Sequence, residues 1–524
     1  MSDSTITGGG VPTPAASFVT PDGVSIIGGG TAQDPIAAAS QQSYTPQVNT
    51  IYARPTGNDG SGDGSLAQPF ATLVAAVLAV PPTIPAGQRY VIDVTGLDET
   101  LPANFTLPAW KAPWTTDIVS VGADALFTAA VAIQATPQPS PLSPSTDAII
   151  NAGDVASQTA AAVSGLITLT LNTPRTTWGA NALRGQLAIA GNVGGGQNCV
   201  IYASSTTTLS LCISAAITEF PITISVPGAT FTGSTTNQPD AGGAAHGALR
   251  AINVDSLLVS GITVNNSVSL TSPGLAFGGG GAYTAQLCNL QSPELAAAST
   301  ALTRAVRCWI TGAPLLRSNG GAVTVMSSLA DAWTGVPVVG NGNVQFRTVV
   351  FSGCATIQAA TGDPAGPSGL EGNVPMTWLL QNCIITATPG TTGDGFLFTG
   401  GRAELVSVDV NSCGRDGIRC AAGAGWMHLA GVGSVLGVVL PSGTTVANTE
   451  YGINVQDGIK VGANAATSTN AHLLAGATDA ILVGALAGLS WATWIDDANN
   501  AFDITAVSGS GATGSGSQLY GTSF

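Results

Sequence analysis

Two carboxylates and two guanidinium groups gather in the segment Asp-Val-Asn-Ser-Cys-Gly-Arg-Asp-Gly-Ile-Arg-Cys, which covers residues 409–420. Hydrolysis of a polysaccharide needs two carboxyl groups on either side of a glycosidic bond, and lyase chemistry needs a base near an arginine or a metal ion that stabilises charge. We therefore predict that Asp416 is the acid or base, that Asp409 or Asp394 is its partner, and that Arg419 clamps the substrate.

The same segment also has the composition of a tight turn. Its two glycines supply backbone angles that other residues avoid, and Asp416 can bond to its own turn. Cys413 and Cys420 have only His428 nearby in sequence, so we expect buried or edge thiols there rather than a nucleophile or a disulfide. The eight cysteines are scattered through a long chain, which favours small buried thiols over a disulfide framework.

Tryptophan side chains could offer a stacking platform for sugar rings. Trp309, Trp378 and Trp426 are the candidates for glycan binding, although Trp309 and Trp378 lie within repeated strands, where they could equally pack in a core. No metal or cofactor site is expected, because the chain has neither a Gly-x-x-x-x-Gly-Lys loop nor a Cys-x-x-Cys pair. The aspartates of residues 57–64 lack the spacing of an EF-hand loop and suit a solvated turn better.

The composition excludes several classes of function. Charged residues make up only 8% of the chain and the net charge is −15, so its field repels nucleic acid and offers no basic surface for phosphates. No apolar run has the length and flanks of a membrane span, and the first residues lack the basic and apolar regions of a secretory signal peptide. We expect a soluble protein that is made in a cytoplasm, binds no nucleic acid and does not insert into a membrane.

The main part of the chain has the period of β-strands. From about residue 91, β-branched and polar residues alternate in short segments bounded by turn-forming residues. A repeat of about 20 residues, stretched by occasional loops, is typical of a solenoid whose units cover one another's cores. The apolar residues that mark the ends of successive repeats are Ile262, Leu290, Ile310, Leu329, Val350, Ile385 and Val410.

One helix is predicted in front of this β-rich body. Residues 51–54 have the pattern of a strand, and residues 57–64 consist of turn formers. Pro69 suits a first helical position, and Pro81-Pro82 must end the helix. The helix over 70–80 has one apolar stripe, which we expect to cover the open end of the first coil. That stripe consists of Phe70, Leu73, Val74, Val77 and Leu78.

Residues 52–77 resemble the entry segment of the pectate-lyase-like right-handed parallel β-helix superfamily. This resemblance implies an all-β protein whose right-handed parallel β-helix begins behind a capping helix. Separately, residues 19–38 resemble the short N-terminal modules that join phage tailspikes and tail fibres to the tail. The first resemblance is carried by Gly57, Asn58, Asp59, Gly64, Pro69, Phe70, Thr72, Ala76 and Val77.

Together these patterns predict four regions. Residues 1–47 would attach the chain to a particle, 48–90 would hold the entry strand, loop and capping helix, 91–440 would form the β-helix, and 441–524 would form a C-terminal cap, trimerisation piece or tip.

The resemblances imply a virion component, a homotrimeric tailspike or tail fibre. Residues 1–47 would join it to a tail or baseplate protein, and the spike would attach to the bacterial surface by binding a polysaccharide. Two alternatives stay open. The spike could be a depolymerase, either a polysaccharide lyase or a glycoside hydrolase, or it could be a purely structural fibre or baseplate protein of a contractile injection system.

Overall fold

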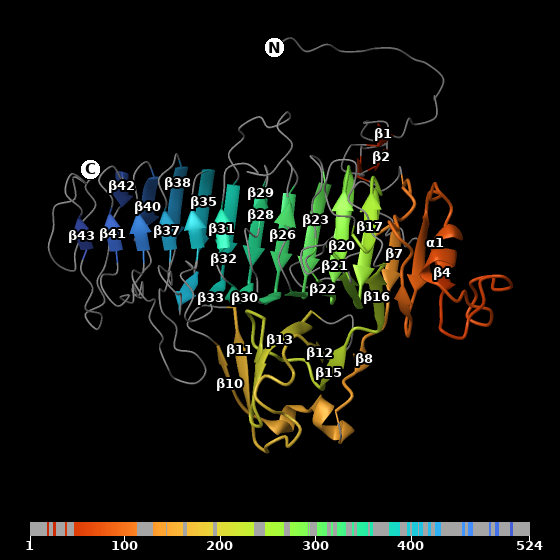
Figure 1. Cartoon of the computed structure of the whole chain (residues 1–524), viewed down its shortest axis with the longest axis horizontal. Coiled ribbons are helices and arrows are strands. Elements are labelled where there is room, and N and C mark those ends of the chain that lie inside the picture. Colours follow the sequence, from red (N-terminus) through yellow and green to blue (C-terminus); the bar gives the residue numbers. More distant parts are fainter. Residues whose placement is uncertain are drawn as a thin grey trace, which may run out of the picture.

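The protein, described here from a computed structural model, is a parallel β-helix with a smaller antiparallel domain at its side (Figure 1). The described residues are 18–19, 25–27, 37–38, 47–112, 129–142, 144–160, 165–191, 196–234, 247–266, 273–291, 293, 301–311, 316–317, 322–331, 338–339, 343–354, 357–359, 377–387, 396–398, 401–406, 408–411, 418–420, 425–430, 453–455, 459–464, 481–483, 488–491 and 504–506.

The longest sheet, called the long sheet below, runs the length of the β-helix, and the pairs between its strands are parallel and in register. Its side chains alternate between the core and the outer surface, as the period of a strand requires. In spatial order its strands are β4 (Gln47–Tyr52), β5 (Gln88–Asp93), β7 (Val131–Gln134), β18 (Ser256–Ser260), β21 (Gly281–Gln286), β23 (Ala301–Val306), β26 (Ala322–Met326), β29 (Asn343–Arg347), β32 (Thr377–Gln381), β35 (Gly401–Val406), β38 (Gly425–Ala430), β40 (Ile459–Asn464) and β42 (Gly488–Trp491).

Two further faces complete each coil. The second sheet contains β6 (Asp98–Thr100), β16 (Ala229–Gly233), β19 (Ile262–Asn266), β22 (Asn289–Gln291), β24 (Trp309–Thr311), β27 (Leu329–Asp331), β30 (Val350–Cys354), β33 (Ile384–Ala387) and β36 (Asp409–Asn411). The third face is divided into β17 (Leu249–Ile252) with β20 (Leu275–Gly278), β25 (Leu316–Arg317) with β28 (Val338–Val339), and β31 (Ile357–Ala359), β34 (Phe396–Phe398), β37 (Ile418–Cys420), β39 (Ile453–Val455), β41 (Ile481–Val483) and β43 (Ile504–Ala506).

The chain turns from the long sheet to the second sheet through one residue in the left-handed region. Non-glycine residues rarely adopt this conformation, which costs about 1–2 kcal/mol, so the stacked coils on both sides must hold it in place. The φ angles of these corner residues lie between 46° and 57°. In chain order the corners are Leu287, Arg307, Ser327, Thr348 and Asn382.

The residue after each corner points into the core, and after four of these five corners it is a cysteine or a serine, so that small side chains recur along the β-helix. The Ser328 hydroxyl donates to the carbonyl of Met326 at 2.6 Å, and the Cys383 thiol lies 3.4 Å from the carbonyl of Gln381. Burial raises the pKa of Cys383 to about 12, which keeps the thiol neutral. Five of the eight predicted buried thiols are confirmed, and the other three side chains lie outside the described residues. The confirmed thiols are Cys199, Cys212, Cys288, Cys308 and Cys383.

The repeat alignment is confirmed for some coils and displaced by one or two residues in others. Leu290 pairs with Ile310 as predicted, but Ile310 pairs with Ala330, not with Leu329. Leu329 pairs with Val350 as predicted. A shift of one residue moves a side chain to the opposite face of a strand. Ile310 and Ala330 therefore lie in the coil core, whereas Leu329 and Val350 face outward into a second apolar cluster.

The predicted helix is present as α1 (Leu73–Leu78), three residues shorter than expected at its N-terminal end. It lies at the end of the molecule formed by β4 (Figure 1). Leu73 and Val77 are buried in the coil core, but Leu78 is 73% exposed, so the apolar stripe is narrower than predicted. Pro69 precedes the helix instead of occupying its first position.

The turn formers before α1 have a local structural role. Asp59 accepts hydrogen bonds from the backbone N–H groups of Ala71 and Thr72 at 2.7 and 3.1 Å, and also from the Thr72 hydroxyl. Thr72 in turn accepts a hydrogen bond from Ala75 N–H and is the N-cap of α1. A Cβ at Gly57 would lie 2.0 Å from the carbonyl oxygen of Phe70, so glycine is required there.

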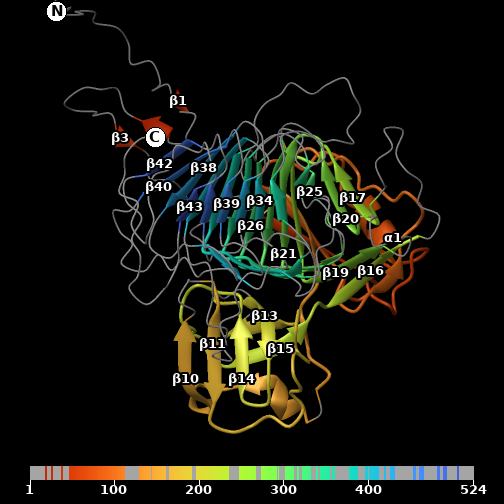
Figure 2. The ribbon, with the colours of Figure 1, turned by 60° about the vertical axis from the view of Figure 1, so that its left-hand side comes forward.

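Residues 138–226, called the insert below, form the antiparallel domain (Figures 1 and 2). The prediction of a continuous parallel β-helix over 91–440 is wrong for this part. Alternating polarity predicts a strand but does not show whether its neighbours run parallel or antiparallel. The insert contains β8 (Gln138–Pro139), η1 (Ser145–Ala148), β9 (Ile149–Ile150), η2 (Ala152–Asp154), β10 (Val155–Ala160), β11 (Ile167–Leu171), β12 (Leu187–Ala190), β13 (Cys199–Ser204), β14 (Thr208–Leu211) and β15 (Ile222–Val226).

The insert occupies one corner of the β-helix, between β7 of the long sheet and β16 of the second sheet. Gly228, where the chain returns, donates its N–H to Gly261 at the corner of the next coil. The insert has its own core, which includes Trp178, Ile201 and Leu209, each with no exposed surface.

Three short strands lie near the N-terminus. β1 (Phe18–Val19) and β3 (Ala37–Ala38) each pair antiparallel with β2 (Ser25–Ile27), and the first pair is the hairpin that a Pro-Asp-Gly turn favours. Among the described residues, no helix has both the length and the apolar character that a membrane span requires.

Substitutions of Phe351 and Val350 test the prediction that these neighbours lie on opposite faces of β30. Phe351→Ala should lower the free energy of unfolding of the β-helix by about 3–5 kcal/mol, because it leaves a cavity between coils. Val350→Ala should instead mainly loosen the insert, which faster proteolysis within residues 138–226 would reveal. Denaturant unfolding followed by circular dichroism measures the first effect, and equal losses of coil stability in both variants would contradict the assigned faces.

Candidate functional site

The predicted catalytic residues are placed only in part. Asp409 lies in β36 of the second sheet, where its backbone pairs with Ile384, and Arg419 lies in β37 on the third face. The backbones of Asp409 and Arg419 are therefore on different faces of the coil. Asp394 and Asp416 lie outside the described residues, so their roles remain predictions.

The three candidate tryptophans differ in their surroundings. Trp378 is fully buried in the coil core, where its ring packs against Phe346 and Phe396, so it cannot offer a face to a sugar. The prediction for this residue is corrected, because its position in β32 faces inward. Trp426 lies in β38, where its backbone pairs with Arg402, and its role in glycan binding remains a prediction.

Trp309 faces outward but is partly covered by the insert. A Cβ at Gly185, which has a φ of +78°, would lie 2.1 Å from Cδ2 of Trp309, so the indole ring rests directly on the glycine backbone. This contact makes Trp309 part of the junction between insert and coil. Among the described residues, no group of three or more histidine, cysteine, aspartate or glutamate side chains could hold a metal ion.

A row of outward-facing positions on the second sheet supports the insert. The apolar members of this row pack against apolar side chains of the insert, which covers the coils of β24, β27, β30 and β33. We call this contact the junction cluster; it comprises Leu166, Leu187, Ile189, Val200, Cys212, Leu287, Leu329, Val350 and Ile384, with Tyr202 and Trp309 packed against it. Along the sheet, the row reads Asn289, Trp309, Leu329, Val350 and Ile384.

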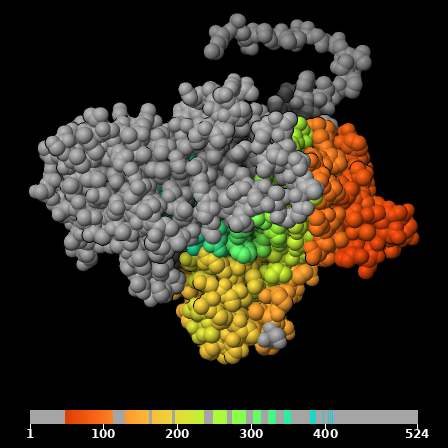
Figure 3. Space-filling view, in the orientation of Figure 1, coloured from red at the N-terminus to blue at the C-terminus, as the bar shows by residue number. Residues whose placement is uncertain are grey.

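Polar contacts fix the orientation of the insert on the coil. The guanidinium of Arg184 donates to both carboxylate oxygens of Asp331, with Nε–Oδ2 and Nη2–Oδ1 distances of 2.7 and 2.9 Å. Burial alone would lower the pKa of Arg184, but hydrogen bonds and the charge of Asp331 raise it. Such paired, charge-assisted contacts are directional, so they add orientation to the apolar contact. The space-filling view shows the yellow insert directly against the green coils (Figure 3).

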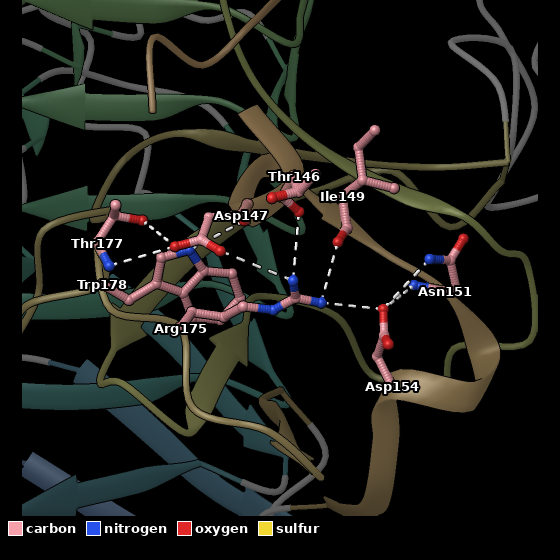
Figure 4. A network of polar contacts seen from close by, with 8 residues as sticks. All are labelled: Thr146, Asp147, Ile149, Asn151, Asp154, Arg175, Thr177 and Trp178. Carbon is pink, nitrogen blue, oxygen red and sulfur yellow. Dashed lines mark hydrogen bonds and ion pairs between the residues drawn. The ribbon is translucent and has the colours of Figure 1, made fainter. Parts of the chain in front are cut away.

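A second polar network stabilises the part of the insert formed by η1, η2 and residues 172–178 (Figure 4). Arg175 Nη2 lies 3.0 Å from the Asp154 carboxylate, and Arg175 Nη1 lies 3.8 Å from that of Asp147. Asp147 also accepts a hydrogen bond from the Thr177 hydroxyl at 2.6 Å. Both carboxylates are therefore engaged in structural contacts and are poorly placed to act on a substrate.

One surface of the insert carries two rows of hydroxyl groups, of which all but Ser210 are exposed or half-buried. Ser157 pairs with Thr170, which pairs with Thr208. The neighbouring residues Leu169 and Leu209 point into the core of the insert, so the hydroxyl residues point outward. The second row lies on the same three strands and consists of Thr159, Thr168 and Ser210, which pair in the same way. We call this surface the hydroxyl face; it comprises Ser157, Thr159, Thr168, Thr170, Thr208 and Ser210.

The hydroxyl face is continuous with the junction cluster. Leu166 and Cys212 belong to that cluster and lie two residues from Thr168 and Ser210 along their strands, a step of about 7 Å. Thr168 and Ser210 share a hydrogen bond of 2.9 Å. The hydroxyl face therefore begins directly beside the coil, on the strands β10, β11 and β14 that stand below it in Figure 2.

The sequence analysis did not identify the hydroxyl face. The alternation Ile-Thr-Leu-Thr-Leu at residues 167–171 does show that Thr168 and Thr170 share one face of a strand. The low charge of residues 138–226 is a second sequence signal for an uncharged polar surface. This stretch has only five charged residues: Asp147, Asp154, Arg175, Arg184 and Glu219.

No protein-family model matches the chain, and no curated protein matches it. Among solved structures, the chain is similar to tailspike protein 3 of bacteriophage CBA120, with a TM-score of 0.28 and 10% identity over 94% of this chain and 64% of that one. It is also similar to the tailspike gp61 of Pseudomonas phage phi297, with a TM-score of 0.18 and 11% identity over 80% of this chain and 61% of that one. This chain therefore spans less than two thirds of either of those proteins.

Gly185 allows a direct test of the junction. Gly185→Ala should displace Trp309 and strain the backbone, so that proteases cut within residues 138–226 faster while the β-helix stays folded. Gly153→Ala is the matched control, because a Cβ there would meet nothing within 4 Å. Equal protease sensitivity of the two variants would contradict the proposed close contact.

The Asp154 network should make the insert sensitive to acid. A hydrogen bond from the backbone of Asn151, together with the charge of Arg175, lowers the pKa of Asp154. A lowered pKa means that this contribution to stability is complete above the unfolded value of about 4 and is lost as pH falls through the folded value. Once corrected for the intrinsic pH dependence of amide exchange, the protection of residues 145–178 should therefore fall below about pH 4.

The variant Asp154→Asn should show a smaller change of exchange with pH over the same range. Asp98→Asn, at an exposed position in β6 of the coil, is the control and should behave as the unmodified chain does. An unchanged pH profile in Asp154→Asn would show that this carboxylate does not stabilise the insert.

Proposed function

We propose that the protein is a tail component of a phage or phage-like particle, a tailspike or tail fibre that attaches the particle to the bacterial surface by binding a glycan. The observation that carries this proposal is a long parallel β-helix with a compact domain fixed on its side by the junction cluster and the Arg184–Asp331 pair. A stiff scaffold that displays a separate, well-oriented domain suits recognition at a distance from the particle.

The N-terminal part supports the same proposal. The entry loop and α1 have the residues that resemble the start of the pectate-lyase-like β-helices, and α1 buries Leu73, Ala76 and Val77 against the first coils. In this proposal α1 closes the open end of the β-helix, and residues 1–47 join the spike to a tail or baseplate protein. In this proposal the spike is a homotrimer, in which symmetric association would bury the apolar flank of a chain with only 8% charged residues.

A depolymerase is the second candidate, and one placement favours it. The backbone of Asp409, a predicted catalytic residue, pairs with that of Ile384, which lies under the insert. A substrate held beside the insert would therefore lie near Asp409. Other carboxylates argue against an enzyme, because they already form ion pairs. Asp93, Asp255 and Asp331 each pair with a cationic side chain.

Two measurements on the purified full-length chain test this function. Light scattering should give the mass of a trimer, and binding to whole bacteria and to a panel of their purified surface polysaccharides should be detectable. Release of reducing ends on the same panel distinguishes the two candidates: an attachment spike releases none, whereas a depolymerase does and loses this activity in Asp409→Asn or Asp416→Asn. A monomer that binds neither cells nor polysaccharides would overturn the proposal.

A further inference from the structure

We propose that the hydroxyl face is the glycan-binding surface and that its ligand is an electrically neutral polysaccharide. This inference rests on the proposed function and specifies both the place and the chemical class of the ligand. The arrangement of the hydroxyl groups, the charges of the insert and the position of the face beside the coil all favour such a ligand.

The hydroxyl groups form a regular array. Strands in a sheet are about 4.8 Å apart, and alternate residues in one strand are about 7 Å apart, so six hydroxyl side chains on β10, β11 and β14 form a two-by-three grid. Each hydroxyl can donate one hydrogen bond and accept others, which matches a ligand that carries rows of hydroxyl groups itself. Ser157 and Thr159 are exposed, and Thr168, Thr170 and Thr208 are half-buried. Ser210 is buried and shares a hydrogen bond with Thr168, so it supports the array from behind, and the Thr208 hydroxyl also shares a hydrogen bond with that of Ser205 at 2.6 Å.

The charges of the insert exclude an acidic ligand. Neither of its two arginines is free, because Arg175 pairs with Asp147 and Asp154, and Arg184 pairs with Asp331. None of the six residues of the hydroxyl face is charged, and the whole chain carries −15, so a polymer of uronic acids or phosphates would be repelled. The binding of an uncharged polysaccharide is not weakened by this repulsion.

Because the hydroxyl face lies beside the coil, a ligand bound to it also lies next to the second sheet of the coil. The grid begins about 7 Å from the junction cluster, and the backbone of Asp409 lies on the coil adjacent to Ile384 of that cluster. Gly165, which immediately precedes Leu166, lies so close to the coil that a Cβ there would be 2.6 Å from the carbonyl oxygen of Asn382. The sheet of the insert and the second sheet of the coil therefore meet at a fixed angle, and a polymer on the hydroxyl face runs beside the coil.

The test uses the full-length chain and two sets of purified bacterial polysaccharides, one neutral and one containing uronic acids, in a surface-binding assay at low and high salt. At least one neutral polysaccharide should bind with an affinity that does not change with salt, since no charges meet. The double variant Thr170→Val and Thr208→Val keeps shape and strand propensity and should bind roughly tenfold or more weakly, because each lost hydrogen bond is worth about 2–10-fold. Ser157→Ala, on the exposed strand β10, should lose roughly threefold.

Thr263→Val is the matched control, because Thr263 is a half-buried, outward-facing threonine of the second sheet outside the hydroxyl face. It should bind as the unmodified chain does. Melting temperature and light scattering on every variant establish that fold and oligomeric state are retained; a change of mass in the double variant would show instead that the hydroxyl face contacts a second copy of the chain, and would overturn the inference.

The remaining outcomes separate this inference from the proposed function. Binding of a neutral polysaccharide that the double variant leaves unchanged would place the site elsewhere while the attachment role stands. Salt-dependent binding of acidic polysaccharides alone would overturn the neutral class. Failure of the unmodified chain to bind either polysaccharides or bacteria would overturn the attachment role and this inference together.

Discussion

In-register stacking of one coil on the next is the constraint on which the rest of the structure depends. Each strand must satisfy its backbone donors and acceptors with the coils before and after it, so the positions facing the core recur in columns along the molecule. The corner residues with left-handed φ follow from this requirement, and so do the compact inward side chains behind them: Cys288, Cys308, Ser328, Val349 and Cys383.

The same stacking also aligns residues on the outer surface, and the protein uses that alignment to hold the insert. Leu329, Val350 and Ile384 come from three different coils, yet they form one apolar strip because their strands are in register. A domain that covers this strip needs no special geometry in any single coil. The direction of the insert is then set by Arg184 and Asp331, whose paired hydrogen bonds permit one orientation.

Periodicity in the sequence was sufficient to predict the β-rich coils and the entry helix, and the scatter of the cysteines along the chain predicted the five thiols that are buried. It was insufficient for the outer surface. Leu329 and Val350 were grouped with core residues such as Ile310 because the covered outer face is as apolar as the inner one, and alternation then loses its meaning.

The hydroxyl face was beyond the sequence for a different reason. Thr168 meets Ser210 across 42 residues, and which antiparallel strands become neighbours depends on the folding of the whole insert. Trp378 was ambiguous in sequence because an aromatic residue in a strand has the same appearance whether it faces the core or a ligand. The catalytic roles of Asp416 and Asp394 are predicted from the sequence pattern.

The place of the insert in the chain has a consequence for cooperativity. It is encoded between β7 and β16, but it rests on β24, β27, β30 and β33, which are synthesised later and are separated from it in the sequence by further coils. A plain solenoid has contacts only between neighbouring repeats, so it can fray from an end one repeat at a time. Here the interface between insert and coil ties the four coils from β24 to β33 to the beginning of the molecule. Fraying from the C-terminal end therefore meets a barrier at β33, and the segment from β7 to β33 behaves as one unit that opens together or stays closed.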